Sequence, residues 1–229
     1  TGTADVATVA TTVTITDNES TNENNAIVFT AGGDLDGGNI GLESDGTLVY
    51  NPSTGKITAT GFIGDISGGT GLTDSQLPTG SVVQVVNAQT GAVATGTTQI
   101  PYDDSVPQIS EGFEVMTRQI TPKSSSNYLL IEVVTHISAS VNSIPVTALF
   151  VDSTANALAA AFTHAYGETH NPLNHKFSHY MTAGTTNQLT FRVRVGCNQS
   201  GTVTFNGREG ARKYGSRLAS SITIFEIQG

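Results

Sequence analysis

The sequence has little of several residue types on which particular classes of protein depend. It contains one cysteine, Cys197, so no internal disulfide can hold the fold together. Basic side chains are also scarce, since 10 Lys and Arg stand against 19 Asp and Glu and give a formal net charge of −9. Because proteins that bind nucleic acid need a basic face to displace counterions, this balance argues against a nucleic-acid partner.

Long apolar runs are absent as well. No run approaches the roughly 18 residues that a membrane-spanning helix requires, and the first residues lack the basic and apolar segments of a signal peptide. We therefore expect no membrane insertion and synthesis in the cytoplasm.

Turn residues interrupt the chain too often for an amphipathic helix, and Thr, Val and Ile dominate between the turns, which predicts an all-β protein. Apolar and polar residues alternate clearly over 129–137 and 189–195, as they do in a strand with one buried face. Further strands are predicted at 82–86, 113–120, 146–151, 157–162, 179–182, 201–205 and 219–227. Residues 80–229 should therefore form a β-sandwich, most simply a jelly roll.

The first part of the chain differs from this second part. Residues 1–100 carry ten acidic side chains, one basic side chain (Lys56) and three aromatic ones. We expect an N-terminal attachment arm over 1–25 and a β-rich shaft with a glycine-rich neck over 26–79. The short strands of the shaft bury too little apolar area to offset the ordering entropy, so we expect three chains to wind together as a homotrimer.

One passage resembles a known family. Residues 51–73 read NPSTGKITATGFIGDISGGTGLT and are similar to a passage common in fibre and structural proteins of tailed phages, cyanophages especially. The segments 78–86 and 220–227 resemble the opening and closing strands of the trimeric jelly rolls of the tumour-necrosis-factor and complement C1q type, and the segment 149–159 resembles a middle hairpin of them. The resemblance implies a trimeric virion fibre or spike whose arm contacts other virion proteins and whose head contacts a glycan or protein of the host surface. A capsid decoration or cement protein without a receptor role is the alternative.

Four of the five histidines fall close together, at His164, His170, His175 and His179. Imidazoles bind zinc and other first-row transition metals, so a metal site, shared across the trimer axis, is one interpretation. The others are a long exposed loop between two strands, with His179 entering the second strand, and a direct ligand contact. Otherwise no cofactor is expected.

Two further sets of residues are candidates for contacts. The only basic cluster, with an aromatic residue inside it, is a candidate for holding a surface polysaccharide and consists of Arg208, Arg212, Lys213, Tyr214 and Arg217. The closing strand has apolar residues on both faces, which makes Phe225 and Ile227 candidates for the trimer interface.

No catalytic motif stands out. Serines occur without a nucleophile elbow, and the nearest arrangements to the paired carboxylates of a glycosidase are Asp103 with Asp104 and Glu111 with Glu114. We therefore expect a binding protein and not an enzyme.

Overall fold

The computed structural model describes residues 20–30, 42–61, 77–164, 167 and 169–229. The chain divides into two compact units, Thr1–Gly69 and Thr70–Gly229. This boundary falls within the segment 26–79 that was predicted as shaft and neck. The predicted strand at 11–16 and most of the predicted arm lie outside the described residues.

The first unit contains an antiparallel sheet in the order β1-β2-β3, with β1 at Asn25–Thr30, β2 at Leu42–Asn51 and β3 at Lys56–Thr58. A tight turn joins β2 to β3, where the amide of Gly55 donates to the carbonyl of Asn51 at 2.9 Å and Asn51 pairs with Lys56. Gly55 has a φ of 65°, which glycine adopts without steric cost. The NPSTGK passage thus spans the end of one strand, a tight turn and the start of the next strand.

The apolar side chains of this sheet are exposed. Val28, Leu42 and Ile57 are 57%, 74% and 56% exposed, and Phe29 and Tyr50 are 40% exposed. Within residues 20–30 and 42–61, no hydrophobic side chain is buried. Among the described residues, the sheet therefore has no buried apolar core within one chain.

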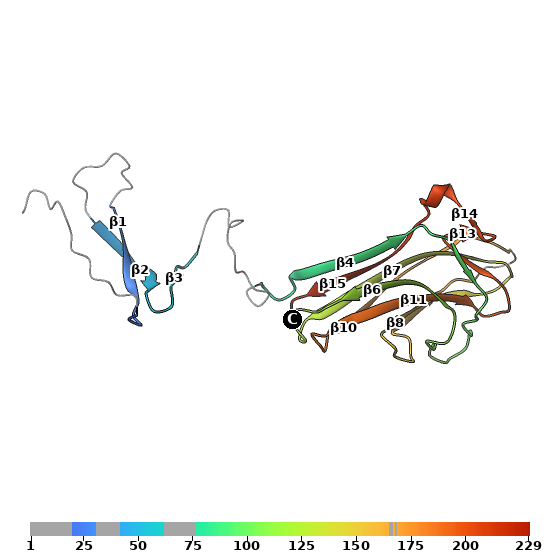
Figure 1. The fold of residues 1–229 in the computed structure, drawn as a ribbon, viewed down its shortest axis with the longest axis horizontal. Coiled ribbons are helices and arrows are strands. Elements are labelled where there is room, and N and C mark those ends of the chain that lie inside the picture. The colour runs from blue at the N-terminus through green and yellow to red at the C-terminus, as the bar shows by residue number, and fades with distance from the viewer. Residues whose placement is uncertain (1–19, 31–41, 62–76, 165–166, 168) are drawn as a thin grey trace, which may run out of the picture. The chain divides into compact units, whose positions relative to one another are not determined.

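The second unit is a β-sandwich (Figure 1). Its strands are β4 (Val82–Thr90), β5 (Ala94–Gly96), β6 (Phe113–Ile120), β7 (Tyr128–Ala139), β8 (Pro145–Val151), β9 (Ala159–Phe162), β10 (Leu173–Thr182), β11 (Leu189–Cys197), β12 (Val203–Phe205), β13 (Gly207–Arg208), β14 (Ala211–Arg212) and β15 (Ser220–Ile227). The only helical element in the described part of the chain is the short 3-10 turn η3 at Tyr214–Ser216. The protein is all-β, as predicted.

The strand order is that of a jelly roll. One sheet places β15 between β4 and β7, with β10 on the other edge of β7, and β12 and β5 extend this sheet beyond the end of β15. The other sheet has the order β6-β11-β8-β9. Successive long strands thus alternate between the two sheets, as they do when two Greek keys form a double-sheet sandwich.

The alternation predicted from sequence decides what is buried between the sheets. Leu129, Ile131 and Val133 of β7 face Phe191 and Val193 of β11 across the core, and all five are fully buried. Cys197 ends β11 and is buried, as expected for a small residue at a strand end. A smaller cluster around Ile100 and Phe150 covers the outer side of β8, so β8 is buried on both faces.

One sequence expectation about the fold is wrong. The segment from His164 to His179 was interpreted as one long loop, whereas β10 already begins at Leu173 and pairs with β7 along its whole length. The alternation that extends this strand is present in the sequence, with Leu173, His175, Phe177 and Met181 facing inward. Two histidines at inward positions of this strand, His175 and His179, masked the pattern, because histidine is not counted as an apolar residue.

No helix in the described residues is long and apolar enough to cross a membrane. In the sandwich of the second unit, the start of β4 and the C-terminus lie at the same end (Figure 1). The opposite end, which carries β13, β14 and η3, is called the distal end below.

Candidate functional site

The predicted basic cluster lies at the distal end, on the hairpin of β13 and β14 and on the residues around η3 that follow it. Gly207 pairs with Arg212 and Arg208 with Ala211, which leaves Glu209 and Gly210 as a two-residue turn. These turn residues have φ angles of 56° and 71°, as a type I′ hairpin turn requires at both central positions. Glycine is suited to this conformation, but Glu209 adopts it at a steric cost.

The five candidate residues share this loop and most of them are open to solvent. Tyr214 is 81% exposed and Arg208, Arg212 and Arg217 are exposed, whereas Lys213 is half-buried. The guanidinium of Arg212 donates to Ser216 Oγ at 3.3 Å, and Arg208 Nε lies 3.6 Å from Glu209 Oε1. The loop thus presents an aromatic ring and several cations together at the surface.

The backbone around Tyr214 is strained. Tyr214, Gly215 and Ser216 have successive φ angles of 50°, 59° and 71°, and left-handed conformations are costly for residues other than glycine. Such strain persists only where the surrounding structure holds it, and it concentrates at binding sites.

Asn206 anchors this loop to the sandwich, a role that no sequence pattern indicated. This fully buried residue donates from Nδ2 to the carbonyl oxygens of Thr90 and Ala92, at 2.7 and 3.1 Å, and accepts from Ser220 Oγ at 2.6 Å. Ser138 Oγ also donates to the carbonyl of Gly207 at 3.0 Å. The hairpin therefore projects from a rigid base, which is the arrangement that holds a binding loop in position.

The four clustered histidines occupy different environments. His164 is exposed, His170 is half-buried ahead of β10, His175 is 3% exposed and His179 is half-buried on β10. Among the described residues, no group of three or more His, Cys, Asp or Glu side chains could hold a metal ion. A metal site shared between subunits stays a prediction.

His175 belongs to the core. Its Nδ1 lies 2.9 Å from Thr147 Oγ1, and Thr147 Oγ1 lies 2.8 Å from Thr135 Oγ1. Burial lowers the pKa of His175 to about 4, because the cationic form loses its hydration. A neutral imidazole within a buried hydroxyl chain is a structural element of the sandwich at neutral pH.

Phe225 and Ile227 lie on the outer face of the sheet that contains β15, because Ile222 and Ile224 on the same strand face the core. The register places Phe225 between Val85 and Leu130, and Leu130 next to Tyr180. In the next row Ile227 lies between Val82 and Tyr128, and the rings of Tyr128 and Tyr180 stack with centroids 5.1 Å apart. We call these seven residues the outer apolar face: Val82, Val85, Tyr128, Leu130, Tyr180, Phe225 and Ile227.

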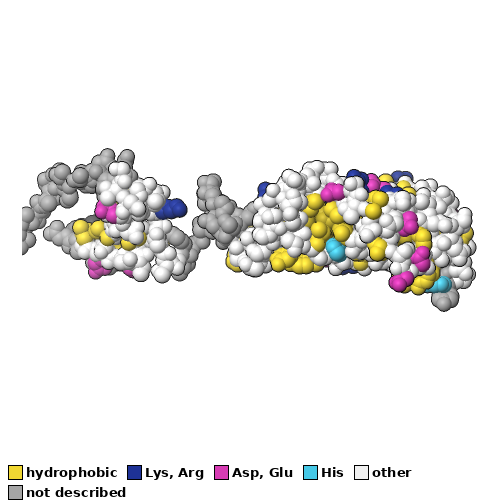
Figure 2. All heavy atoms as spheres, turned by 90° about the horizontal axis from the view of Figure 1, so that it is seen from below, with side chains coloured by type: hydrophobic (Ala, Val, Ile, Leu, Met, Phe, Trp, Pro, Cys, Tyr) yellow, Lys and Arg dark blue, Asp and Glu magenta, His cyan; other side chains and the backbone are white. Residues whose placement is uncertain are grey.

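The outer apolar face is partly open to solvent. Val82, Val85 and Tyr180 are 53%, 50% and 54% exposed. Exposed hydrophobic side chains also gather across the middle of the head in the view from below, with acidic side chains towards one end (Figure 2). Contiguous exposed apolar patches on a β-sheet are typical of a surface that contacts another protein.

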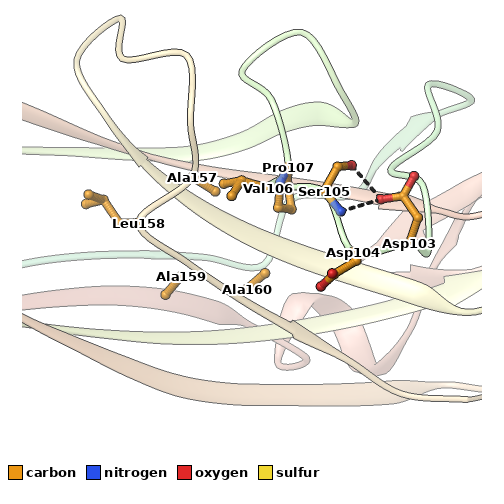
Figure 3. Close-up of a pocket in the computed structure, with 9 residues that line it drawn as sticks. All are labelled: Asp103, Asp104, Ser105, Val106, Pro107, Ala157, Leu158, Ala159 and Ala160. Carbon is orange, nitrogen blue, oxygen red and sulfur yellow. Dashed lines mark hydrogen bonds between the residues drawn. The ribbon is translucent and has the colours of Figure 1, made fainter.

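The predicted carboxylate pairs lie outside both the basic cluster and the outer apolar face. Asp103 and Asp104 line a hollow of about 370 Å³ whose other wall is formed by residues 157–160 (Figure 3). Hydrogen bonds from Ser105 lower the pKa of Asp103, which is the reverse of what the general acid of a glycosidase needs. Glu114 pairs with Arg192 at 3.0 Å, and Glu111 accepts from the backbone amide of Gln108 at 2.9 Å.

No family model and no curated protein matches the sequence. Among solved structures the chain is similar to Eiger TNF from S. frugiperda, with a TM-score of 0.37 and 13% identity over 62% of this chain and 92% of that one. It is also similar to the C-terminal domain of EclA, described as a sugar-binding protein, with a TM-score of 0.29 and 12% identity over 52% of this chain and 76% of that one. A chain of infectious bursal disease virus, Gt strain, gives a TM-score of 0.31 and 13% identity over 65% of this chain, which spans only 39% of the viral chain. The jelly-roll assignment rests on the strand order.

Proposed function

We propose that the protein is a homotrimeric virion structural protein, a fibre or spike that acts by binding and not by catalysis. The observation that carries this proposal is the exposure of the apolar side chains in β1, β2 and β3, because three strands without a buried core need partners to be stable. The fibre-like passage at residues 51–73 includes the turn between β2 and β3 and supports a virion role. The residues before β1 would attach the trimer to other virion proteins.

The outer apolar face is the surface through which the heads would associate. Its rows at Phe225 and Ile227 carry large apolar side chains on a sheet whose other face already forms the core. A charge in the middle of such an interface is costly, because it loses hydration without gaining a partner.

The trimer is tested by the mass of the native protein in sedimentation equilibrium. The unmodified chain should sediment as a trimer, and Phe225→Glu should shift it towards monomer. Val106→Glu is the matched control, since Val106 is 49% exposed on a loop and lies outside the outer apolar face. A wild-type monomer in dilute native solution would overturn the trimer.

The distal hairpin is the part of the head that would contact the host surface. Its cations and the ring of Tyr214 suit an anionic glycan, through charge-assisted hydrogen bonds and stacking. Three copies on one trimer would raise a weak affinity by avidity.

Host contact is tested by the adsorption of labelled protein to host cells. Replacing both Arg212 and Arg217 by Ala should reduce adsorption, while Lys123→Ala, an exposed residue far along the chain from the hairpin, should not. Unchanged adsorption of the double variant would remove the hairpin from the proposal.

The alternative is a capsid decoration or cement protein with no receptor role. Gold-labelled antibody against the head, viewed on whole particles, separates the two functions by position. Label on the tail or at fibre tips supports the adhesive function, whereas label over the capsid shell supports the alternative.

A further inference from the structure

Next to the basic hairpin lies a second hollow, built from segments that are far apart in the sequence. It has a volume of about 550 Å³. Thr95 comes from β5, Thr204 from β12, Ser140 from the residue after β7 and His170 from the segment before β10, and Glu209 and Gly210 form the hairpin turn. Its volume lies within the roughly 300–1,000 Å³ of small-molecule sites.

The hydroxyl groups of this hollow are held in place and keep capacity to donate. Thr204 Oγ1 accepts from the amide of Gly210 at 3.0 Å, and Ser140 Oγ accepts from the amide of Thr202 at 2.9 Å. A hydroxyl that accepts one hydrogen bond still has its own hydrogen to donate and a second lone pair. Both side chains are therefore preorganised to hydrogen-bond a ligand.

Two residues of the hollow have backbone conformations that residues other than glycine rarely adopt. His170 has a φ of 60° and Glu209 a φ of 56°. The amide of His170 donates to the carbonyl of Ala139 at 2.6 Å, and the hydrogen bond from the amide of Gly210 to Thr204 Oγ1 holds the turn at Glu209. Left-handed residues that the fold over-determines occur preferentially at ligand sites.

The chemistry of the lining selects a ligand class. None of the described residues that line the hollow is a large hydrophobic residue, whereas sites for apolar ligands are lined mainly by such side chains. None is Lys or Arg, and the single carboxylate, Glu209, lies 3.6 Å from Arg208 Nε, so the lining itself supplies no cation to hold an anionic ligand. Hydroxyls, a carboxylate acceptor and an imidazole match a ligand with several uncharged hydroxyl groups.

We propose that this hollow, centred on Ser140, His170, Thr204 and Glu209, binds a neutral saccharide unit. The proposal rests on the proposed adhesive function and refines it, because it adds a contact with a neutral sugar beside the arginines that would contact an anionic glycan. The carboxylate of Glu209 would accept from sugar hydroxyls, and the hydroxyls of Ser140 and Thr204 would donate to them.

The experiment measures binding of the full chain to immobilised dextran, galactan and chitin oligosaccharides, with alginate as the anionic comparison. Wild-type protein should bind at least one neutral probe. Glu209→Gln and Ser140→Ala should each lower the affinity about tenfold or more, the loss expected when a hydrogen bond to a charged or preorganised group is removed.

The matched control is Asp104→Asn, which removes one negative charge from an exposed residue of another hollow and should bind as wild type does. Thermal unfolding of each variant verifies that the head remains folded. If neither Glu209→Gln nor Ser140→Ala reduces binding to the neutral probes, the saccharide site is overturned. Binding of the wild-type protein to alginate alone would also overturn it. Host-cell adsorption by wild-type protein in either case leaves the adhesive function standing, whereas no adsorption by wild-type protein overturns both.

Discussion

The side-chain amide of Asn127 donates to Glu226 Oε1 at 2.7 Å, and both residues are fully buried. The same carboxylate accepts from the backbone amides of Lys123 and Ser124, at 2.8 and 3.3 Å, and its second oxygen accepts from Gln84 Nε2. One carboxylate on the closing strand thus satisfies the donors of the turn that precedes β7. Buried charged groups are tolerated only where hydrogen bonds replace their hydration in this way.

Replacing Glu226 by Ala should lower the free energy of unfolding by about 3 kcal/mol or more, because four donors, including the fully buried amide of Asn127, lose their acceptor. Chemical denaturation followed by intrinsic tyrosine fluorescence measures this loss. Glu114→Ala is the control: its pair with Arg192 is about one-third exposed, and such surface pairs contribute at most about 1 kcal/mol. Equal losses in the two variants would contradict the importance of the buried carboxylate.

Acid should weaken the head through His175. Its pKa is about 4 in the folded protein and 6.5 as the ordinary value, so the unfolded chain binds a proton more readily than the folded one. The stability that neutral His175 contributes is present above pH 6.5 and is lost as the pH falls towards 4. This change amounts to about 3 kcal/mol.

The measurement is the free energy of unfolding of wild type and His175→Gln between pH 7 and pH 4. Gln keeps an acceptor for Thr147 but does not titrate, so the variant should lose less stability over this range. His136→Gln is the control, because burial also lowers the pKa of His136 but this residue lies on the more exposed outer face. Parallel pH curves for wild type and His175→Gln would contradict the assignment.

Gly91 should be intolerant of a side chain. A Cβ at this position would collide with the backbone carbonyl of Ser216, so the loop that carries Tyr214 would have to move. Gly91→Ala should cost about 1–3 kcal/mol, as overpacking typically does. It should also speed tryptic cleavage after Arg212, Lys213 and Arg217. Gly46→Ala, where nothing lies within 4 Å, should change neither quantity.

Alternation in the sequence predicted β7 and β11 well, because each strand has one face in the core and one outside. The same principle predicted only the last part of β10, because histidines occupy two of the inward positions of this strand. His175 is buried there because Thr147 on the opposite sheet supplies a hydrogen-bond partner. That partner is 28 residues away, so no local pattern identifies it.

The predicted site residues divide in the same way. Local sequence was sufficient to group the basic residues of the hairpin, because the turn at Glu209 and Gly210 keeps them on one loop. The hollow beside that loop could not be predicted, since its hydroxyls come from strands that meet only after folding.

By itself the sequence determined that this protein is all-β, that its acidic first part lacks the large side chains of a core, and that its second part alternates as a sandwich does. Spacing along the chain encodes these properties, because a strand exposes successive side chains to opposite faces. Only the tertiary structure decided that Glu226 and His175 are buried, that Phe225 and Ile227 lie outside the core, and that Ser140, Thr204 and Glu209 share one hollow. Each of these depends on the order in which distant strands pair, and that order brings together residues that the sequence keeps apart.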